Sequence, residues 1–338
     1  MTMPIDPDLM RDPDQNKRRD LTIAAAAIVV CVVLPFVFPN RYLIGQGVTL
    51  FLWVAVVSQW NLVFGVGGIF SLAQLAIFAV GGYSAAMLAL YLNVSLWFGM
   101  FLGGLVATGF SLIVGLACLR LSGAYVALLT LALATALQVL IITDTTCFMR
   151  QGVTCMTFTG GSRGLSRFGD FGFTAMLGRA NAPLGNYFLA FAVALAAMLF
   201  AYLVIYSPIG LAFRAIRDNK LYSIGRGISS VRFQLLIFGA SAFFTGMAGA
   251  VFAGHYRAIG ANILDTSLLL FLLSMMVIGG LGRFWGPLAG TTALLLFDEA
   301  MKELGEWRLA GLGAILLLSV IFMPNGIVGL FRSRPAAR

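Results

Sequence analysis

The chain has 338 residues, of which 60% are hydrophobic and 10% charged, and its mean hydropathy is +0.95. Soluble domains carry about 25% charged residues, so this composition excludes an ordinary soluble protein. The formal net charge of +9 does not by itself indicate nucleic-acid binding, because the cytoplasmic loops of membrane proteins concentrate Lys and Arg.

The apolar residues form long runs of Leu, Ala, Val and Phe that do not alternate with polar residues. A bilayer admits only helices and closed barrels, because every backbone polar group must be satisfied there, and unalternating runs indicate helices. A helical span needs roughly 20 apolar residues. We therefore expect an all-α, polytopic helical membrane protein with about 10 transmembrane or re-entrant helices. The candidate spans are 21–38, 43–65, 70–92, 95–118, 122–143, 185–206, 231–253, 266–282, 285–300 and 308–323.

The distribution of basic residues predicts the orientation and the domain organisation. With the amino terminus inside, fourteen of the 22 Lys and Arg residues fall in inner loops and tails, as the positive-inside rule requires. Both termini are then cytoplasmic. We expect an N-terminal tail at 1–20, one transmembrane domain at 21–325 with an external loop at 144–184 and a cytoplasmic segment at 207–230, and a C-terminal tail at 326–338.

The external loop holds Cys147 and Cys155, whereas Cys31 and Cys118 lie in expected spans. Two cysteines eight positions apart in an oxidising compartment can form a disulfide, and two free thiols are the alternative. No cluster of His and Cys with zinc spacing surrounds them, so we expect no metal site.

Glycine-rich breaks occur at "GVGG" (65–68) and "IGGLG" (278–282), each between two expected spans on the inner side. Glycine permits sharp turns and the close approach of helices, so tight packing of neighbouring helices explains both breaks. The alternative is that the segments after them are broken or re-entrant helices that line a transport path.

Several kinds of chemistry are missing from the sequence. The chain contains no Gly-Lys dipeptide and therefore no phosphate-binding loop of the G-x-x-x-x-G-K-[ST] type. Its single histidine, His255, lies at the outer end of a span, which argues against a Ser-His-Asp triad. The first five spans contain no acidic residue, although ion-coupled carriers usually keep charged groups at depth. We expect that the chain is not an enzyme and that the energy for any transport comes from elsewhere.

The polar segment "RAIRDNKLYSIGRGI" (214–228) interrupts the apolar sequence. Read as a helix, it places Leu221, Ile224 and Ile228 on one apolar face, which Phe213 and Ile216 extend by a turn. The preceding "SPIG" (207–210) starts this helix with a proline at its first turn. Such an amphipathic cytoplasmic helix lies on lipid, forms an ordinary basic loop, or fits a groove on a partner protein.

The segment resembles the cytoplasmic coupling segment of ABC importer permeases, and in particular the M-type permeases of branched-chain amino acid importers. The resemblance rests on Arg-Ala-Ile-Arg-Asp at 214–218 followed by "FFTGMAGAVFAGHYRAIG" at 243–260. It continues in "NLVFGVGGIFSLAQLAIFAVGGYSAAML", "LRLSGAYVALLTLALA", "TGGSRGL", "MMVIGGLGRFWGPLAG" and "PNGIVGLF", over about 290 residues. The sequence departs from the family at Tyr222-Ser223-Ile224, where Ala-Ala-Glu is usual, at Lys220, where an acid is common, and at Gln74.

The resemblance implies a permease subunit with the ABC importer permease fold in a bacterial inner membrane. Its implied partners are a second homologous permease subunit, two cytoplasmic ATPases and a periplasmic solute-binding protein. ATP and Mg²⁺ would bind the ATPases, and this chain would hold no cofactor. The external loops at 159–164 and 255–265 would receive the binding protein. The implied ATPase-coupling residues are Arg214, Ile216, Arg217, Asp218, Asn219, Leu221, Ile224 and Gly227, and the candidates for the translocation path are Ser71, Gln74, Tyr83 and Thr130.

The leading hypothesis is thus the import of branched-chain or related amino acids. Permeases of the same machinery for urea, short amides or aromatic acids are the alternative within the family. From other classes, we consider an ion-coupled secondary carrier that acts alone, and a membrane scaffold without a path. A scaffold explains neither the glycine breaks nor the polar helix.

Overall fold

The computed structural model describes residues 13–119, 121, 123–151, 154–302, 311, 313, 314, 317, 321 and 326–330, for some of which, Cys155 among them, only the backbone is described. The expected span 308–323 lies largely outside these residues, as does most of each expected tail. The chain divides into two compact units, Met1–Gly47 and Val48–Arg338. Helix α2 (Arg41–Asn61) runs through the boundary between them.

The first unit contains α1 (Pro13–Val37) and the start of α2. Helix α1 begins inside the range assigned to the N-terminal tail. The turn between the two helices is short, and the Asn40 side chain accepts a hydrogen bond from the Tyr42 backbone N–H at 2.9 Å. This bond satisfies one of the free donors at the start of α2.

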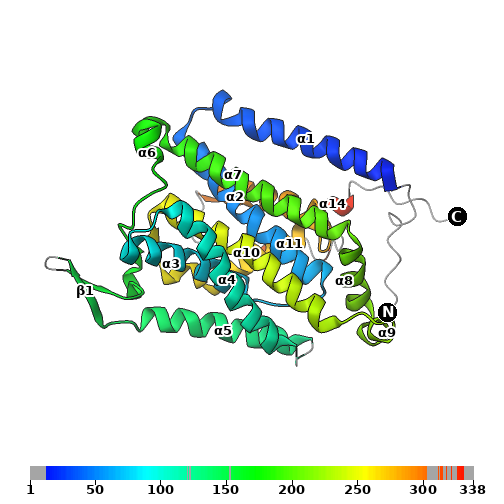
Figure 1. The fold of residues 1–338 in the computed structure, drawn as a ribbon. Helices are drawn as coiled ribbons and strands as arrows, with labels where there is room; N and C mark the ends of the chain where they lie inside the picture. The colour runs from blue at the N-terminus through cyan, green and yellow to red at the C-terminus, as the bar shows by residue number, and fades with distance from the viewer. Residues whose placement is uncertain are drawn as a thin grey trace. The chain divides into compact units, whose positions relative to one another are not determined.

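The second unit is mostly helical (Figure 1). Helix α2 ends in a π-helical turn, Leu62–Val66, and the chain stays non-helical until α3 begins at Gln74. The helices that follow are α3 (Gln74–Leu92), α4 (Leu96–Cys118), α5 (Ala124–Ile142), α6 (Phe173–Met176), α7 (Gly178–Ile205), α8 (Pro208–Asp218), α9 (Lys220–Gly225), α10 (Ser230–Tyr256), α11 (Thr266–Gly279), α12 (Gly286–Ala300) and α14 (Ile327–Leu330).

Six helices of the described chain are long and apolar enough to cross a membrane: Arg41–Val66, Gln74–Leu92, Leu96–Cys118, Ala124–Ile142, Ala180–Ile205 and Ser230–Tyr256. The expectation of a helical membrane protein is therefore confirmed, whereas the count of about 10 spans is not. Helix α11 has only 14 residues, and α12 has 15. At 1.5 Å per residue each is about 21–23 Å long, which is shorter than the roughly 30 Å hydrocarbon core.

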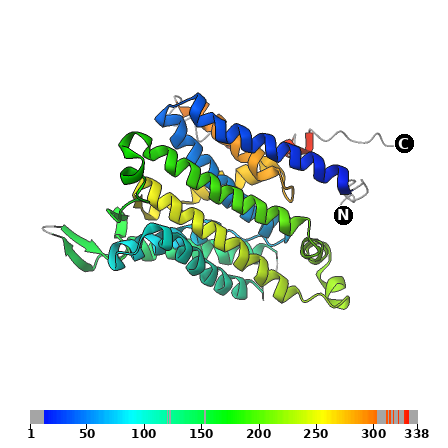
Figure 2. The ribbon, with the colours of Figure 1, turned by 45° about the horizontal axis from the view of Figure 1, so that its top comes forward.

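Helices α3, α4 and α10 pack side by side in the second unit (Figure 2). Glycines line their contacts. A Cβ added at Gly81 on α3 would lie 2.3 Å from the Cα of Gly246 on α10. This approach suits a membrane protein, because helices without a hydrophobic driving force between them gain most from close van der Waals contact.

The loop between α5 and α7 contains strands, so a purely α description is incomplete. Strands β1 (Cys147–Gln151) and β2 (Thr154–Thr157) form an antiparallel hairpin, in which Arg150 pairs with Cys155. The hairpin lies at the opposite end of the second unit from α8 and α9 (Figure 1). Strand β3 (Leu165–Ser166) pairs with β4 (Ala258–Ile259), which follows α10.

We predict that Gly81→Ala lowers the stability of the protein, because its new methyl group would collide with the backbone of α10. Overpacking of this kind costs about 1–3 kcal/mol. Gly109→Ala on α4 is the matched control, since nothing lies within 4 Å of a Cβ added there. The apparent melting temperature of the detergent-solubilised protein should fall for Gly81→Ala alone. Equal melting temperatures for the two variants would contradict the packing described above.

Candidate functional site

The two glycine-rich breaks meet at the side chain of Asn61. The first break contains Gly65, in the π-helical turn, and the second contains Gly282, between α11 and α12. The Asn61 Oδ1 atom accepts a hydrogen bond from the Gly282 backbone N–H at 2.8 Å, and its Nδ2 atom donates to the Arg283 carbonyl at 3.0 Å. These two bonds tie the end of α2 to the turn between α11 and α12.

Close approach explains why glycine stands at this meeting point. A Cβ added at Gly65 would lie 2.3 Å from Asn61 Oδ1 and 2.4 Å from the Gly282 nitrogen. Any other residue at position 65 would therefore separate the π-helical turn from the turn between α11 and α12. The sequence indicates both breaks, but nothing in it indicates that Asn61 joins them.

The non-helical segment 67–73 is held by side chains from two other places. The indole Nε1 of Trp60 donates to the Ser71 carbonyl at 2.8 Å, and the Leu72 backbone N–H donates to the Thr130 hydroxyl at 2.8 Å. Irregular backbone at membrane depth is tolerated where protein covers it and satisfies its polar groups. Trp60 and Thr130 are both fully buried and do so here. Sequence reasoning missed Trp60.

Three of the four path candidates gather around this segment. Ser71 belongs to it, Thr130 binds it, and Gln74 begins α3 directly after it. Gln74 Nε2 donates to the Thr245 hydroxyl at 2.7 Å and to the Val56 carbonyl at 3.3 Å, and so links α3 to α10 and α2.

The fourth candidate, Tyr83, lies nine residues further along α3, about 13 Å away along the helix axis. Its hydroxyl is buried, and no residue of the described chain forms a hydrogen bond with it. All four candidates are buried in this conformation.

The polar segment forms two helices, and the expectation of one continuous apolar face is wrong. The chain leaves the helical conformation at Asn219, whose side chain accepts a hydrogen bond from the Tyr222 backbone N–H at 3.0 Å and thereby starts α9. Ile216 on α8 is buried, whereas Leu221 on α9 is 84% exposed and Ile224 is 47% exposed. The change of direction at Asn219 places the two sets of apolar residues on different surfaces.

The two arginines of α8 bind the chain's own backbone. Arg214 Nη2 donates to the Ile205 carbonyl at 3.1 Å. Arg217 Nη1 donates to the Gly65 carbonyl at 2.7 Å, and its Nε lies 3.2 Å from Asp218 Oδ1. The remaining coupling candidates, Asp218 and Gly227, are exposed.

At the opposite end of the unit, two carboxylates hold loops in place. Asp144 accepts hydrogen bonds from the backbone N–H and the hydroxyl of Thr159, each at 2.7 Å, and these bonds lower the pKa of Asp144. Asp170 accepts from the Thr174 hydroxyl at 2.7 Å and forms a 2.5 Å ion pair with Arg257.

The pKa of Asp170 is lowered, first by the hydrogen bond from Thr174 and then by the Gly172 backbone N–H and by Arg257, although partial burial acts in the opposite direction. Asp170 therefore fixes the loop before α7 to the end of α10.

Two further predictions from the sequence concern the cysteines and the absence of a metal site. Cys147 is disulfide-bonded, whereas Cys31 and Cys118 are in the reduced form. The side chain of Cys155 lies outside the described residues, so the Cys147–Cys155 pairing stays a prediction. Among the described residues, no three His, Cys, Asp or Glu side chains are grouped so that they could hold a metal ion.

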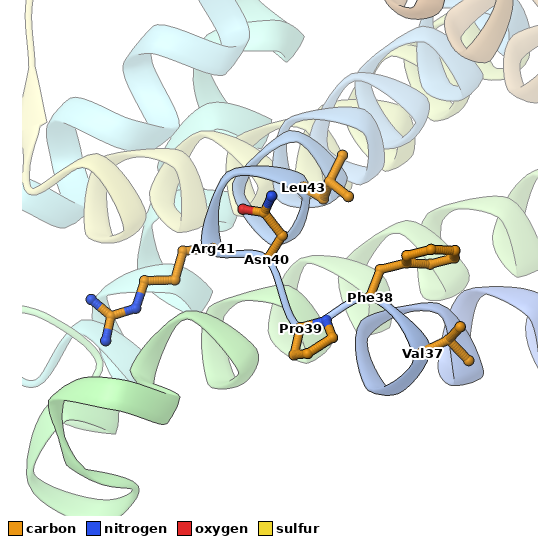
Figure 3. A pocket seen from close by; sticks show the side chains of 6 residues that line it. All are labelled: Val37, Phe38, Pro39, Asn40, Arg41 and Leu43. Atoms are coloured by element: carbon orange, nitrogen blue, oxygen red, sulfur yellow. The ribbon is translucent and has the colours of Figure 1, made fainter.

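An open surface notch of about 650 Å³ lies at the turn between α1 and α2 in the first unit. Its lining contains none of the predicted site residues, and Arg41 points away from the Phe38 ring (Figure 3). We therefore do not assign this notch to the functional site.

We predict that Asp170→Asn destabilises the protein at neutral pH. Because the pKa of Asp170 is lower in the folded than in the unfolded chain, its stabilising effect is fully present above the ordinary pKa of 3.8 and is lost as the pH falls through the lower folded value. The melting temperatures of wild type and variant should thus differ at pH 7 and converge below about pH 3.8.

Thr174→Val is the companion variant, since it removes the largest cause of the lowered pKa and should move this convergence to higher pH. A difference between wild type and Asp170→Asn that does not change with pH would contradict the assignment.

Comparison with known proteins agrees with the membrane fold. The family described as "Branched-chain amino acid transport system / permease component" matches residues 42–323. The "High-affinity branched-chain amino acid transport system permease protein LivM" of Salmonella typhimurium (strain LT2) is 26% identical over 328 residues, which cover 91% of this chain and 74% of that protein. The protein of the same name from Escherichia coli (strain K12) has the same identity and coverage. No solved structure matches. The chain belongs to the family of branched-chain amino acid transport permeases.

Proposed function

We propose that this chain is the membrane-spanning permease subunit of an ATP-driven importer for branched-chain or related amino acids. The observation that carries the proposal is the family match over residues 42–323, which include all six membrane-crossing helices except the first residue of the first one. The names of the LivM relatives support the same substrate class. Within the proposal, a second homologous permease completes the membrane part, and two cytoplasmic ATPases bind ATP and Mg²⁺.

We assign the ATPase-docking surface to α9. Leu221, Tyr222 and Ile224 are exposed there, and we call these three residues the α9 face. They are apolar side chains on a short polar segment, and an exposed apolar patch of this kind marks a contact with another molecule. Arg226 lies over the Tyr222 ring, 4.9 Å from its centroid, and holds that ring in position.

The arrangement of α8 supports this assignment. Phe213 and Ile216 are buried, and the Phe213 ring packs edge to face against Phe233 of α10 at 5.6 Å between centroids. Helix α8 is thus fixed to the transmembrane helices, and α9 presents its apolar residues away from them. With the α8–α9 end in the cytoplasm, as the positive-inside rule favours, the α9 face meets the ATPases.

The opposite end then faces the periplasm and receives the solute-binding protein. The pairing of β3 with β4 brings the predicted receiving loops, 159–164 and 255–265, next to one another. A Cβ added at Gly164 would lie 2.3 Å from the Ile259 carbonyl, so the two loops are in direct contact. We propose that they form one docking surface.

The translocation path passes close to the non-helical segment 67–73. Ser71, Gln74 and Thr130 offer neutral hydroxyl and amide groups there, which can exchange their present hydrogen bonds for bonds to a polar solute. The same groups would serve urea, short amides or aromatic acids, so substrates of those classes remain the alternative within the family.

The function is tested by purifying the chain together with the ATPases, second permease and binding protein encoded beside it, and by measuring ATP hydrolysis and uptake in vesicles. We expect hydrolysis that a binding protein loaded with leucine, isoleucine or valine stimulates, together with uptake of that amino acid. A chain that transports solute alone, in response to an ion gradient, would instead be a secondary carrier and would refute the proposal.

For the docking surface, we predict that Leu221→Asp abolishes the recovery of the ATPases with the permease, because it places a charge at the centre of the α9 face. Membrane insertion should be unaffected, since the wild-type side chain is 84% exposed. Met176→Asp is the control, because Met176 is 76% exposed and ends helix α6, which lies at the opposite end of the unit from α8 and α9 (Figure 1). If both variants retain the ATPases and normal uptake, the α9 face is not the docking surface.

A further inference from the structure

We propose that Arg217 is the positioning residue that transmits the movement of α8 to the two glycine-rich turns of the transmembrane domain. This inference rests on the proposed function and deepens it. It changes the role expected for Arg217 from the sequence: its guanidinium binds this chain rather than the ATPase.

The contact of Arg217 with the first turn is direct. Its Nη1 atom donates to the Gly65 carbonyl at 2.7 Å, across 152 residues of sequence. The stem of the side chain lies against Gly68, where an added Cβ would stand 2.3 Å from Arg217 Cγ. Gly68 also has a φ of +69°, which other residues rarely adopt. The arginine and this turn therefore fit together at two points.

The Gly65 carbonyl needs such a donor. At the end of a helix the last carbonyls have no intrahelical partner. The backbone N–H groups of Gly67, Gly68 and Ile69 donate to the carbonyls of Leu62, Phe64 and Val63 respectively. None of these three N–H groups donates to the Gly65 carbonyl. The guanidinium supplies the donor, and its positive charge also suits the negative end of the helix dipole.

The turn between α11 and α12 also lies beside the Gly65 carbonyl and the Arg217 guanidinium. A Cβ added at Gly282 would lie 3.1 Å from the Gly65 carbonyl oxygen and 3.5 Å from Arg217 Nη1. Asn61, one turn before Gly65, binds the Gly282 N–H and the Arg283 carbonyl. One side chain from α8 therefore contacts a junction that contains the end of α2 and the link between α11 and α12.

This junction leads to the proposed path. The segment that follows Gly68 contains Ser71, and the side chains of Trp60 and Thr130 bind its backbone. When the ATPases displace α9 and α8, the Gly65 carbonyl either follows Arg217 or loses its donor. Both events move or release the turn that leads into segment 67–73.

The Asp218 carboxylate is a second acceptor beside the Arg217 guanidinium, and it makes it feasible for Arg217 to release the Gly65 carbonyl. Asp218 lies 3.2 Å from Arg217 Nε and stays exposed, so the charge keeps a partner when the bond to Gly65 breaks. No other acidic side chain of the described chain forms an ion pair with Arg217.

The test uses the complete complex with its ATPases and binding protein. Arg217→Met keeps the apolar stem against Gly68 but removes the donor and the charge. We expect the four types of subunit to assemble and the basal ATP hydrolysis to stay at the wild-type rate. Stimulation by the loaded binding protein and uptake should both fall about tenfold, as the loss of one hydrogen bond from a charged donor predicts.

Arg217→Lys restores a charged donor of similar length and should recover most of the stimulation. Arg232→Met is the matched control, because Arg232 is an exposed cation at the start of α10 with the same change of charge. It should behave as wild type.

Three results would overturn the inference. Loss of the ATPases from purified Arg217→Met would make Arg217 a docking contact. Failure of both Arg217 variants to assemble would make its role purely structural. Normal uptake by Arg217→Met would mean that the contact transmits nothing. A wild-type complex that shows no stimulated hydrolysis would count against the proposed function instead, so the two failures are distinguishable.

Discussion

Peptide groups that lie outside a helix but inside an apolar bundle are the constraint on which this structure depends. Between the π-helical turn and Gln74 the backbone satisfies only some of its own polar groups, and an unpaired buried peptide group costs several kcal/mol in lipid. Trp60 and Thr130 supply partners within this segment, and Arg217 supplies one to Gly65 in the turn before it. Segment 67–73 is therefore held in one conformation by the elements around it.

Because the side chains that bind segment 67–73 belong to other helices, the segment is sensitive to movements of those helices. A regular helix keeps its hydrogen bonds when a neighbour moves, whereas a segment bound through side chains of other helices loses bonds or moves with them. Broken helices at transport sites have this property, because their backbone is stabilised by the surrounding protein. Segment 67–73 lies between α5, through Thr130, and the end of α2, through Trp60, so a relative movement of the two affects it directly.

Much of this arrangement could be predicted from sequence, because apolar runs and glycine clusters are local signals. The runs locate the six long helices, and the sequence alone identifies Ser71, Gln74 and Thr130 as neutral polar residues among apolar ones. The contact between Arg217 and Gly65 could not be predicted, since it joins positions 152 residues apart. The division of the polar segment had a local signal in Asn219, a good residue to start a helix. An apolar spacing that continued through Asn219 hid this signal, because periodicity alone cannot show where a helix stops.

The break at Asn219 gives the two helices separate tasks. Helix α8 buries Phe213 and Ile216 and extends Arg217 to the Gly65 carbonyl, whereas α9 leaves Leu221 exposed. A single straight helix with the same residues would turn its apolar face only one way, so it could pack against the transmembrane helices or against a partner but not both. Two short helices joined at Asn219 can do both, because each has its own apolar side. Helix α8 meets the membrane domain through the packing of Phe213 against Phe233 and through the hydrogen bond from Arg217 to the Gly65 carbonyl, so under the proposed function a force applied to α9 reaches the transmembrane helices by both routes.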